Sequence, residues 1–157
     1  MELKTKVNAE EGAQELKVTR DFDLPVDLLF RAYIDPEIVE QWMGTKVLKL
    51  ENKKHGSWQI ETGDNKGNVY FRASGVFHEL IPGRKITRTF EMENAPFDVQ
   101  LEFLEFEALT ADTSRLNMQI VYRSNAHRDQ MLKVGAGMAK GMSMAHNRLE
   151  EVAKKLK

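Results

Sequence analysis

Hydrophobic and polar residues alternate along most of this chain between positions 15 and 123. In residues 15–23 the apolar side chains of Leu16, Val18 and Phe22 alternate with polar neighbours, which is the period-two pattern of a half-buried β-strand. From residue 46 onwards, alternating runs are separated by turn residues such as glycine, proline and asparagine, and this pattern predicts an antiparallel meander. The strands predicted for the meander span residues 46–51, 57–62, 68–78, 84–92, 98–107 and 114–123.

Two short helices are predicted between the first strand and the meander. Pro25 ends the strand and suits the first turn of a helix. Asp35 followed by Pro36 gives a second helix start, with aspartate as the N-cap, and Gly44 ends this second helix. The apolar side of the two helices consists of Val26, Leu29, Phe30, Tyr33, Ile38, Val39, Trp42 and Met43.

The C-terminal part of the chain predicts one long helix. Ser124 and Asn125 offer a cap, and the sequence continues to Lys157 without a proline. Apolar residues recur in steps of three and four along one side, and they form ordinary core in the second half but are mostly methionine in the first half. Three glycines in the first half cost the helix roughly 1 kcal/mol each relative to alanine, so a compensating role is expected. The stripe consists of Met131, Gly135, Met138, Met142, Ala145, Leu149, Val152 and Leu156, with Gly137 and Gly141 beside it.

Together these elements predict an α+β fold, in which a curved antiparallel sheet of about seven strands packs against the C-terminal helix. In the last strand Leu116, Met118 and Ile120 share one face, which must be covered, while the opposite face is polar. Residues 1–14 are expected to be an N-terminal arm with little function that can add one short edge strand. Residues 15–157 are expected to form a single domain, because the length and the 41% hydrophobic content suit one core.

Composition and charge argue against several kinds of partner. Lys and Arg total 23 against 24 Asp and Glu, so the formal net charge of -1 gives no electrostatic reason to expect nucleic acid or an anionic membrane. The absence of cysteine removes disulfides, thiolate metal sites and cysteine nucleophiles, and it fits a reducing compartment. The N-terminus has no apolar segment of signal-peptide length, and no run approaches membrane-spanning length. We therefore expect a cytoplasmic protein without membrane insertion.

The methionines and glycines of the last helix suggest a cavity between helix and sheet. Gly135 would leave space there, and flexible, polarizable methionine side chains suit walls that fit apolar ligands of varied shape. Close packing of the helix on the sheet is the alternative, and it is preferred for Gly137 and Gly141. The aromatic side chains are either core or cavity wall, and a tryptophan N–H suits the polar edge of a pocket. The residues expected to contact a ligand are Trp42, Trp58, Phe77, Phe90, Met118, Met131, Gly135, Met138 and Met142.

No catalytic set emerges from the motifs. The four histidines, His55, His78, His127 and His146, are scattered and form no known metal-binding or nucleophile motif. His78 and Glu79 point to opposite faces of a strand and so do not form an acid–base pair. The carboxylates Glu102, Glu105 and Glu107 are candidates for proton transfer, but the last two share a face and most simply mark the wet side of their strand. We therefore assign no catalytic residue, no metal ligand and no cofactor.

Specific motifs narrow the fold further. The order of elements matches the helix-grip fold, and the segments resemble the activator of heat shock protein 90 ATPase homologue-like family of the SRPBCC (START-related) superfamily over residues 16–156. Met43 departs from the pattern, because many members have a second tryptophan there, and the departure would widen or soften that corner of a cavity. The segments that carry the resemblance are 18–25 (VTRDFDLP), 29–33 (LFRAY), 35–44 (DPEIVEQWMG), 75–80 (GVFHEL), 89–91 (TFE) and 128–149, which begins RDQML and ends NRL.

The resemblance implies the fold more firmly than it implies an activity. Members of the superfamily resemble one another in enclosing an apolar cavity, and their ligands include lipids, sterols and polyketides. Three functions stay open for this chain. The first is non-catalytic binding of a small apolar ligand, lipid-like or aromatic. The second is regulation of a heat shock protein 90 type ATPase as a co-chaperone in a stress response, and the third is a cyclase-like or hydrolytic enzyme using the same cavity. Homodimer formation is also open.

Overall fold

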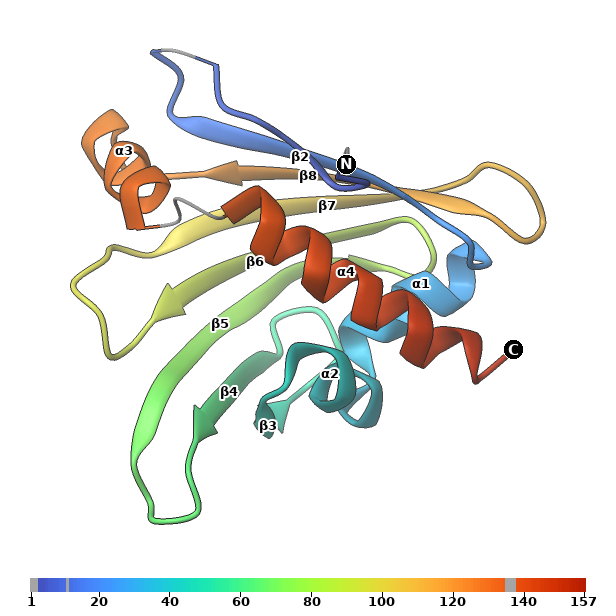
Figure 1. Cartoon of the computed structure of the whole chain (residues 1–157), viewed down its shortest axis with the longest axis horizontal. Helices are drawn as coiled ribbons and strands as arrows, with labels where there is room; N and C mark the ends of the chain where they lie inside the picture. The colour runs from blue at the N-terminus through green and yellow to red at the C-terminus, as the bar shows by residue number, and fades with distance from the viewer. Residues whose placement is uncertain (1–2, 11, 135–137) are drawn as a thin grey trace.

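A computed structural model describes residues 3–10, 12–134 and 138–157 of the chain (Figure 1). The strands in this part are β1 (Lys6–Asn8), β2 (Glu15–Phe22), β3 (Lys46–Leu50), β4 (Ser57–Gly63), β5 (Val69–Ile81), β6 (Lys85–Met92), β7 (Gln100–Ala108) and β8 (Ser114–Val121). The helices are α1 (Val26–Ile34), α2 (Pro36–Met43), α3 (Asn125–Val134) and α4 (Met138–Lys154). The predicted α+β class and all seven predicted strands are confirmed, and the short edge strand expected from the arm is β1.

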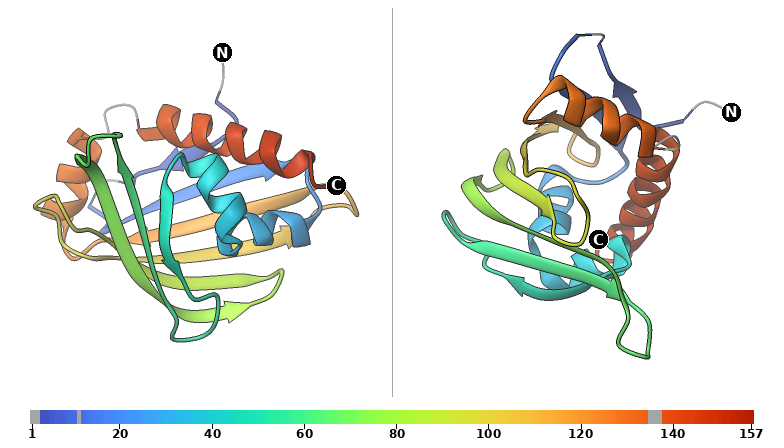
Figure 2. Two further views of the ribbon diagram at one scale, coloured as in Figure 1. Left: turned by 90° about the horizontal axis from the view of Figure 1, so that it is seen from below. Right: turned by 90° about the vertical axis from the view of Figure 1, so that its left-hand side faces the viewer.

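The strands form one antiparallel sheet in the order β1-β2-β8-β7-β6-β5-β4-β3. The chain begins at one edge with β1 and β2, and crosses through α1 and α2 to the opposite edge at β3. It then returns strand by strand until β8 pairs with β2. Figure 2 shows that the sheet is strongly curved and that α4 lies across its inner face, with α1 and α2 beside it. Elements from both ends of the chain therefore enclose one core.

Local sequence signals set the ends of α2. The Asp35 side chain accepts a hydrogen bond from the backbone N–H of Glu37 at 3.1 Å and so caps the helix, while Pro36 occupies its first turn. Gly44 ends the helix in the left-handed region at φ 65°, where glycine has no steric penalty. These signals set the start of α2 at Pro36 and its end at Met43, and within this helix Trp42 lies in the core, where it is 5% exposed.

The inner face of the sheet is apolar with a few polar exceptions. Along β8 every second residue is buried, which is the alternation that the sequence predicts. The polar side chains on this face include those of Arg20, Arg88, Gln100 and Glu102, and each of these is mostly removed from water. Buried polar groups need partners, so these four residues identify places where the core is not simple packing.

The C-terminal segment forms two helices, which corrects the prediction of one long helix. Figures 1 and 2 show that α3 and α4 run in different directions. Residues 135–137, which include the predicted Gly135 and Gly137, lie outside the described part of the chain. Leu149 and Ala153 of α4 are fully buried, but Leu156 is 46% exposed. The prediction that Leu156 belongs to the core is wrong because α4 ends at Lys154.

Candidate functional site

An enclosed cavity lies between α2 and the inner face of the sheet. Its volume is about 20 Å³, which is room for about one water molecule. We call it the aromatic cavity, because five of its wall residues are aromatic. The residues that line it are Tyr33 of α1, Val39, Trp42 and Met43 of α2, Leu50 of β3, Trp58 and Ile60 of β4, Phe77 of β5, and Arg88 and Phe90 of β6.

Aromatic contacts hold the walls of this cavity in place. The rings of Tyr33 and Trp42 meet edge to face, with their centroids 5.2 Å apart, and the rings of Trp58 and Phe90 lie 5.5 Å apart. Edge-to-face and tilted pairs at this distance are favourable beyond the area that they bury. Phe77 is 1% exposed, whereas Met43 and Phe90 are only partly buried. The cavity therefore has a rigid inner side and a more accessible side at Met43 and Phe90.

A close approach of two strands positions Trp58. Trp58 of β4 pairs directly with Gly75 of β5. A side chain at Gly75 would place its first carbon 1.9 Å from the backbone oxygen of Thr89 and 2.8 Å from Nε1 of Trp58. The absence of a side chain at residue 75 thus lets the indole ring cross over β5 towards Phe90 of β6.

The polar edge of the aromatic cavity is a buried ion pair. Arg88 donates from Nε to Oε1 of Glu102 at 2.8 Å, and Gln100 donates to Oε2 of the same carboxylate at 2.7 Å. The guanidinium carbon of Arg88 lies 5.4 Å from the Trp58 ring centroid and 5.8 Å from the Tyr33 ring centroid, within the range of cation–π attraction. Arg88 is therefore fixed between two aromatic walls by Glu102.

The two indole N–H groups of the cavity differ in their hydrogen bonding. Trp42 donates from Nε1 to the backbone oxygen of Ala32 at 2.7 Å. Nε1 of Trp58 is buried and has no hydrogen-bond partner in the part of the chain that the structure describes. A buried donor without a partner is costly, so the Trp58 N–H is a candidate for contact with a ligand.

Tyr33 connects the aromatic cavity to a second polar cluster. Its hydroxyl lies 3.4 Å from Nε2 of His146, and Nδ1 of His146 lies 2.8 Å from the hydroxyl of Thr5 in the N-terminal segment. Burial, and to a smaller extent the nearby cation of Arg20, lowers the pKa of His146 to about 4. Burial also raises the pKa of Tyr33 well above its usual value. Both rings are therefore neutral near pH 7.

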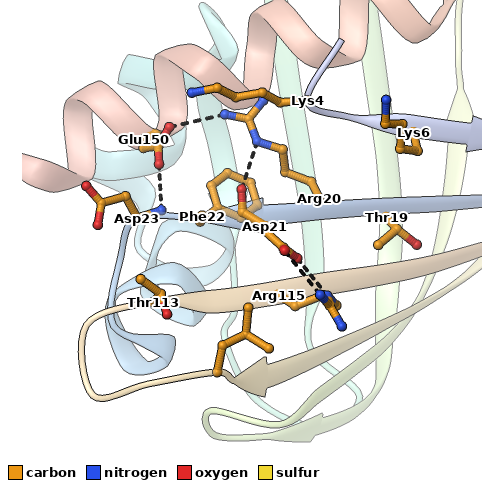
Figure 3. A pocket seen from close by; sticks show the side chains of 11 residues that line it. Lys4, Lys6, Thr19, Arg20, Asp21, Phe22, Asp23, Thr113, Arg115 and Glu150 are labelled. Carbon is orange, nitrogen blue, oxygen red and sulfur yellow. Dashed lines mark hydrogen bonds and ion pairs between the residues drawn. The ribbon is translucent and has the colours of Figure 1, made fainter. Parts of the chain in front are cut away.

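An ion pair closes this second cluster on the side of α4. Arg20, whose side chain is fully buried, donates to Oε2 of Glu150 at 3.1 Å, and the backbone N–H of Asp23 donates to Oε1 at 2.6 Å. Figure 3 shows these contacts, together with the bidentate pair between Arg115 and Asp21, in an open groove of about 630 Å³. Because most charged groups of this groove pair with one another, it is a weaker candidate for a binding site than the aromatic cavity.

The structure brings together four of the predicted site residues and separates the others. Trp42, Trp58, Phe77 and Phe90 line the aromatic cavity. Met118 lies elsewhere in the core, and Met131 and Met142 are partly buried and pack against the core outside the cavity wall. Gly135 and the side chain of Met138 lie outside the described part of the chain.

Sequence reasoning missed Tyr33 and Arg88 as wall residues of the cavity. The helical spacing places Tyr33 on the apolar side of a helix and gives no sign of a cavity beside it. The signal for Arg88 was present, because it occupies the same face of β6 as Ile86 and Phe90, and a charged residue on an apolar face needs a buried partner. That partner is Glu102, which sequence reasoning considered only for proton transfer.

The described residues offer little for catalysis. Both carboxylate oxygens of Glu102 accept hydrogen bonds from neighbouring side chains. His78 is exposed on β5, and Glu105 and Glu107 are exposed on the wet side of β7, as predicted. In the part of the chain that the structure describes, no group of three or more His, Asp or Glu side chains could hold a metal ion, and no helix is long and apolar enough to cross a membrane.

The curved antiparallel sheet and the helix across its inner face define a helix-grip protein, and the family model that it matches places it in the SRPBCC superfamily. The family model described as "Activator of Hsp90 ATPase homolog 1-like protein" matches residues 23–154. The chain belongs to this family. A comparison with curated proteins gives no match.

Solved structures confirm the fold. Protein Ms6760 from Mycobacterium smegmatis is similar with a TM-score of 0.80 and 18% identity, covering 94% of this chain and 95% of that one. A protein from Arthrobacter aurescens has a TM-score of 0.81 and 19% identity, with 96% and 91% covered. A protein from Rhodobacter sphaeroides has a TM-score of 0.81 and 16% identity, with 98% and 99% covered. At these identities the likeness extends to the fold alone.

Proposed function

We propose that this chain binds a small apolar molecule, aromatic or lipid-like, in the aromatic cavity and does not transform it. The observation that carries the proposal is an enclosed space whose wall contains five aromatic side chains and the guanidinium of Arg88. Small-molecule sites are commonly concave and apolar, with a few polar groups that orient the ligand. The family and fold support a ligand-binding or co-chaperone-like domain, and the cavity favours the first of these.

Binding requires the aromatic cavity to widen. Its volume of about 20 Å³ is far below the ~150 Å³ that holds a benzene molecule in a protein core. The accessible side of the wall contains Met43, which has three rotatable bonds, and Leu50 of the edge strand β3. Among the described strands β3 pairs with β4 alone, and its register shifts between Val47 and Lys49. We therefore expect the wall at α2 and β3 to move when a ligand enters.

Filling the corner of the cavity at Met43 tests this proposal. In the wild type, the neutral dye N-phenyl-1-naphthylamine should show a saturable rise in fluorescence. The change Met43→Trp should weaken dye affinity about tenfold, because overpacking a cavity costs roughly 1–3 kcal/mol. Met144→Trp is the matched control, since Met144 is 52% exposed on α4, and its affinity should equal that of the wild type.

Two outcomes count against the proposal. The first is no saturable signal in the wild type, with circular dichroism confirming that the protein is folded. The second is an equal loss of affinity in Met43→Trp and Met144→Trp, which would place the dye outside the aromatic cavity.

Regulation of a chaperone ATPase is the second candidate, and the description of the matching family favours it. It requires contacts on the outer surface and no open cavity. Stimulation of a heat shock protein 90 type ATPase by micromolar protein, equal in the wild type and in Met43→Trp, would support this candidate over ligand binding.

A further inference from the structure

The aromatic cavity presents hydrogen-bond donors and almost no acceptors. Among its described wall residues, the side-chain polar groups are the hydroxyl of Tyr33, the indole N–H groups of Trp42 and Trp58, and the guanidinium of Arg88. None of these described wall residues carries a carboxylate or an amide side chain. The Trp42 donor is already used by Ala32, and the Tyr33 hydroxyl meets His146. Arg88 donates from Nε to Glu102, whereas the buried Nε1 of Trp58 has no hydrogen-bond partner among the described residues.

The position of that donor is fixed before any ligand arrives. The Trp58 ring is packed against Phe90 on one side and over Gly75 of the next strand, and the Arg88 guanidinium stands 5.4 Å from its centroid. A donor held in this way loses little freedom when it binds an acceptor, so the hydrogen bond contributes fully to affinity. A pure hydrocarbon in the same place would leave the N–H buried and unsatisfied.

The charge of the wall distinguishes a neutral acceptor from an anion. The cation of Arg88 is balanced by Glu102, and the second oxygen of that carboxylate is held by Gln100. A carboxylate ligand would therefore bring a charge into an apolar space where the local cation is already paired, and burial of an unpaired charge is strongly unfavourable. A neutral carbonyl or ether oxygen meets the donor without this penalty.

We propose that the ligand is a neutral aromatic molecule with a hydrogen-bond acceptor, such as an aryl ketone, and that Trp58 Nε1 donates to that acceptor. This inference rests on the proposed function, because it assigns a chemical class to the ligand of the aromatic cavity. Arg88 and Glu102 act as positioning residues that keep the wall electrically neutral and hold the indole ring.

Three probes of similar size test the ligand class: acetophenone, ethylbenzene and benzoate. The chain contains two tryptophans, so its ¹H–¹⁵N spectrum has two indole signals, which the variants Trp58→Phe and Trp42→Phe assign. Acetophenone should move the Trp58 indole proton downfield and bind about fivefold more tightly than ethylbenzene, the equivalent of one ordinary hydrogen bond. Benzoate should bind more weakly than acetophenone.

The variants separate a hydrogen bond from simple packing. Trp58→Phe keeps an aromatic ring but lacks the N–H, so acetophenone and ethylbenzene should bind it equally. Trp42→Phe is the matched control, and it should keep the preference for the ketone because the Trp42 N–H is already bonded to Ala32.

The outcomes distinguish this inference from the proposed function. Equal affinities for acetophenone and ethylbenzene in the wild type, or tightest binding of benzoate, would overturn the ligand class while leaving a binding cavity in place. A ketone preference that survives in Trp58→Phe would equally overturn it. If none of the three probes shifts a signal of a cavity residue up to its solubility limit, the proposed function itself fails.

Discussion

His146 of α4 lies in the core, where burial and a neighbouring cation oppose a second proton on its ring. It is 4% exposed and packs edge to face on Phe22. Three polar groups face the ring: the cation of Arg20 on β2, the hydroxyl of Tyr33 on α1, and the hydroxyl of Thr5 in the N-terminal segment. The nearest carboxylate on its own helix, Glu150, is already used by Arg20. Folding therefore favours the neutral ring.

The consequence is a loss of stability in mild acid. The pKa of His146 is lowered from 6.5 to about 4, with burial as the largest cause and Arg20 as the second. A depressed folded-state pKa means that the unfolded chain takes up the proton first, so the stability is present above pH 6.5 and is lost as the pH falls towards 4. Between pH 8 and pH 5 this linkage lowers the free energy of unfolding by about 2 kcal/mol.

Urea denaturation at a series of pH values measures this loss. With a slope of roughly 2 kcal/mol per molar urea, the wild-type midpoint should fall by about 1 M between pH 8 and pH 5. His146→Asn keeps a polar group near Thr5 but does not titrate, so it should be less stable at pH 8 and nearly independent of pH in this range. The matched control is His55→Asn, because His55 is exposed and its φ of 69° suits asparagine. If His146→Asn loses as much stability towards pH 5 as the wild type does, the reasoning is refuted.

Three further predictions concern stability, each measured by urea denaturation with circular dichroism. Gly75→Ala should destabilise the protein by roughly 1–3 kcal/mol or more, because the new carbon meets the backbone oxygen of Thr89, and an unchanged midpoint would contradict the close approach. His127→Phe should stabilise by about 1 kcal/mol, because both ring nitrogens of this buried histidine lack hydrogen-bond partners among the described residues, and a loss of stability would show that they have one. Glu150→Leu should lower the free energy of unfolding by about 3–5 kcal/mol, because it leaves the buried Arg20 without its ion pair. Adding Arg20→Met to this variant should recover part of the loss, whereas additive effects of the two changes would argue against an interaction between the two side chains.

The sequence predicts the fold well because one face of each central strand is buried. The resulting period of two is visible in β8, where buried and half-buried residues alternate from Ser114 to Val121. The helical spacing misleads at the C-terminus. Apolar residues keep a spacing of three and four from Met131 to Val152, although α3 and α4 run in different directions. A helical period describes spacing along the chain, and it contains no information on a change of axis between two helices.

The site is less accessible to sequence reasoning. Trp42 and Trp58 could be found, because a tryptophan with an apolar body and a single donor suits a pocket wall. The enclosed space beside them, however, lies against α2, whereas the sequence directed attention to the methionines of the C-terminal segment. Its position depends on which helix covers which part of the sheet, and that is decided by packing between elements far apart in the chain.

Polar residues on the inner face are the signal that sequence reasoning used too little. Arg20 and Arg88 each occupy a strand position between apolar residues of the same face, so periodicity alone marks them as buried charges in need of partners. Their partners, Glu150 and Glu102, cannot be chosen from the sequence, because the first pair joins residues 130 positions apart. Charged residues on the inner face thus identify where the core departs from simple packing. Only the fold shows that the pair of Arg88 and Glu102 borders a cavity, while the pair of Arg20 and Glu150 links β2 to α4.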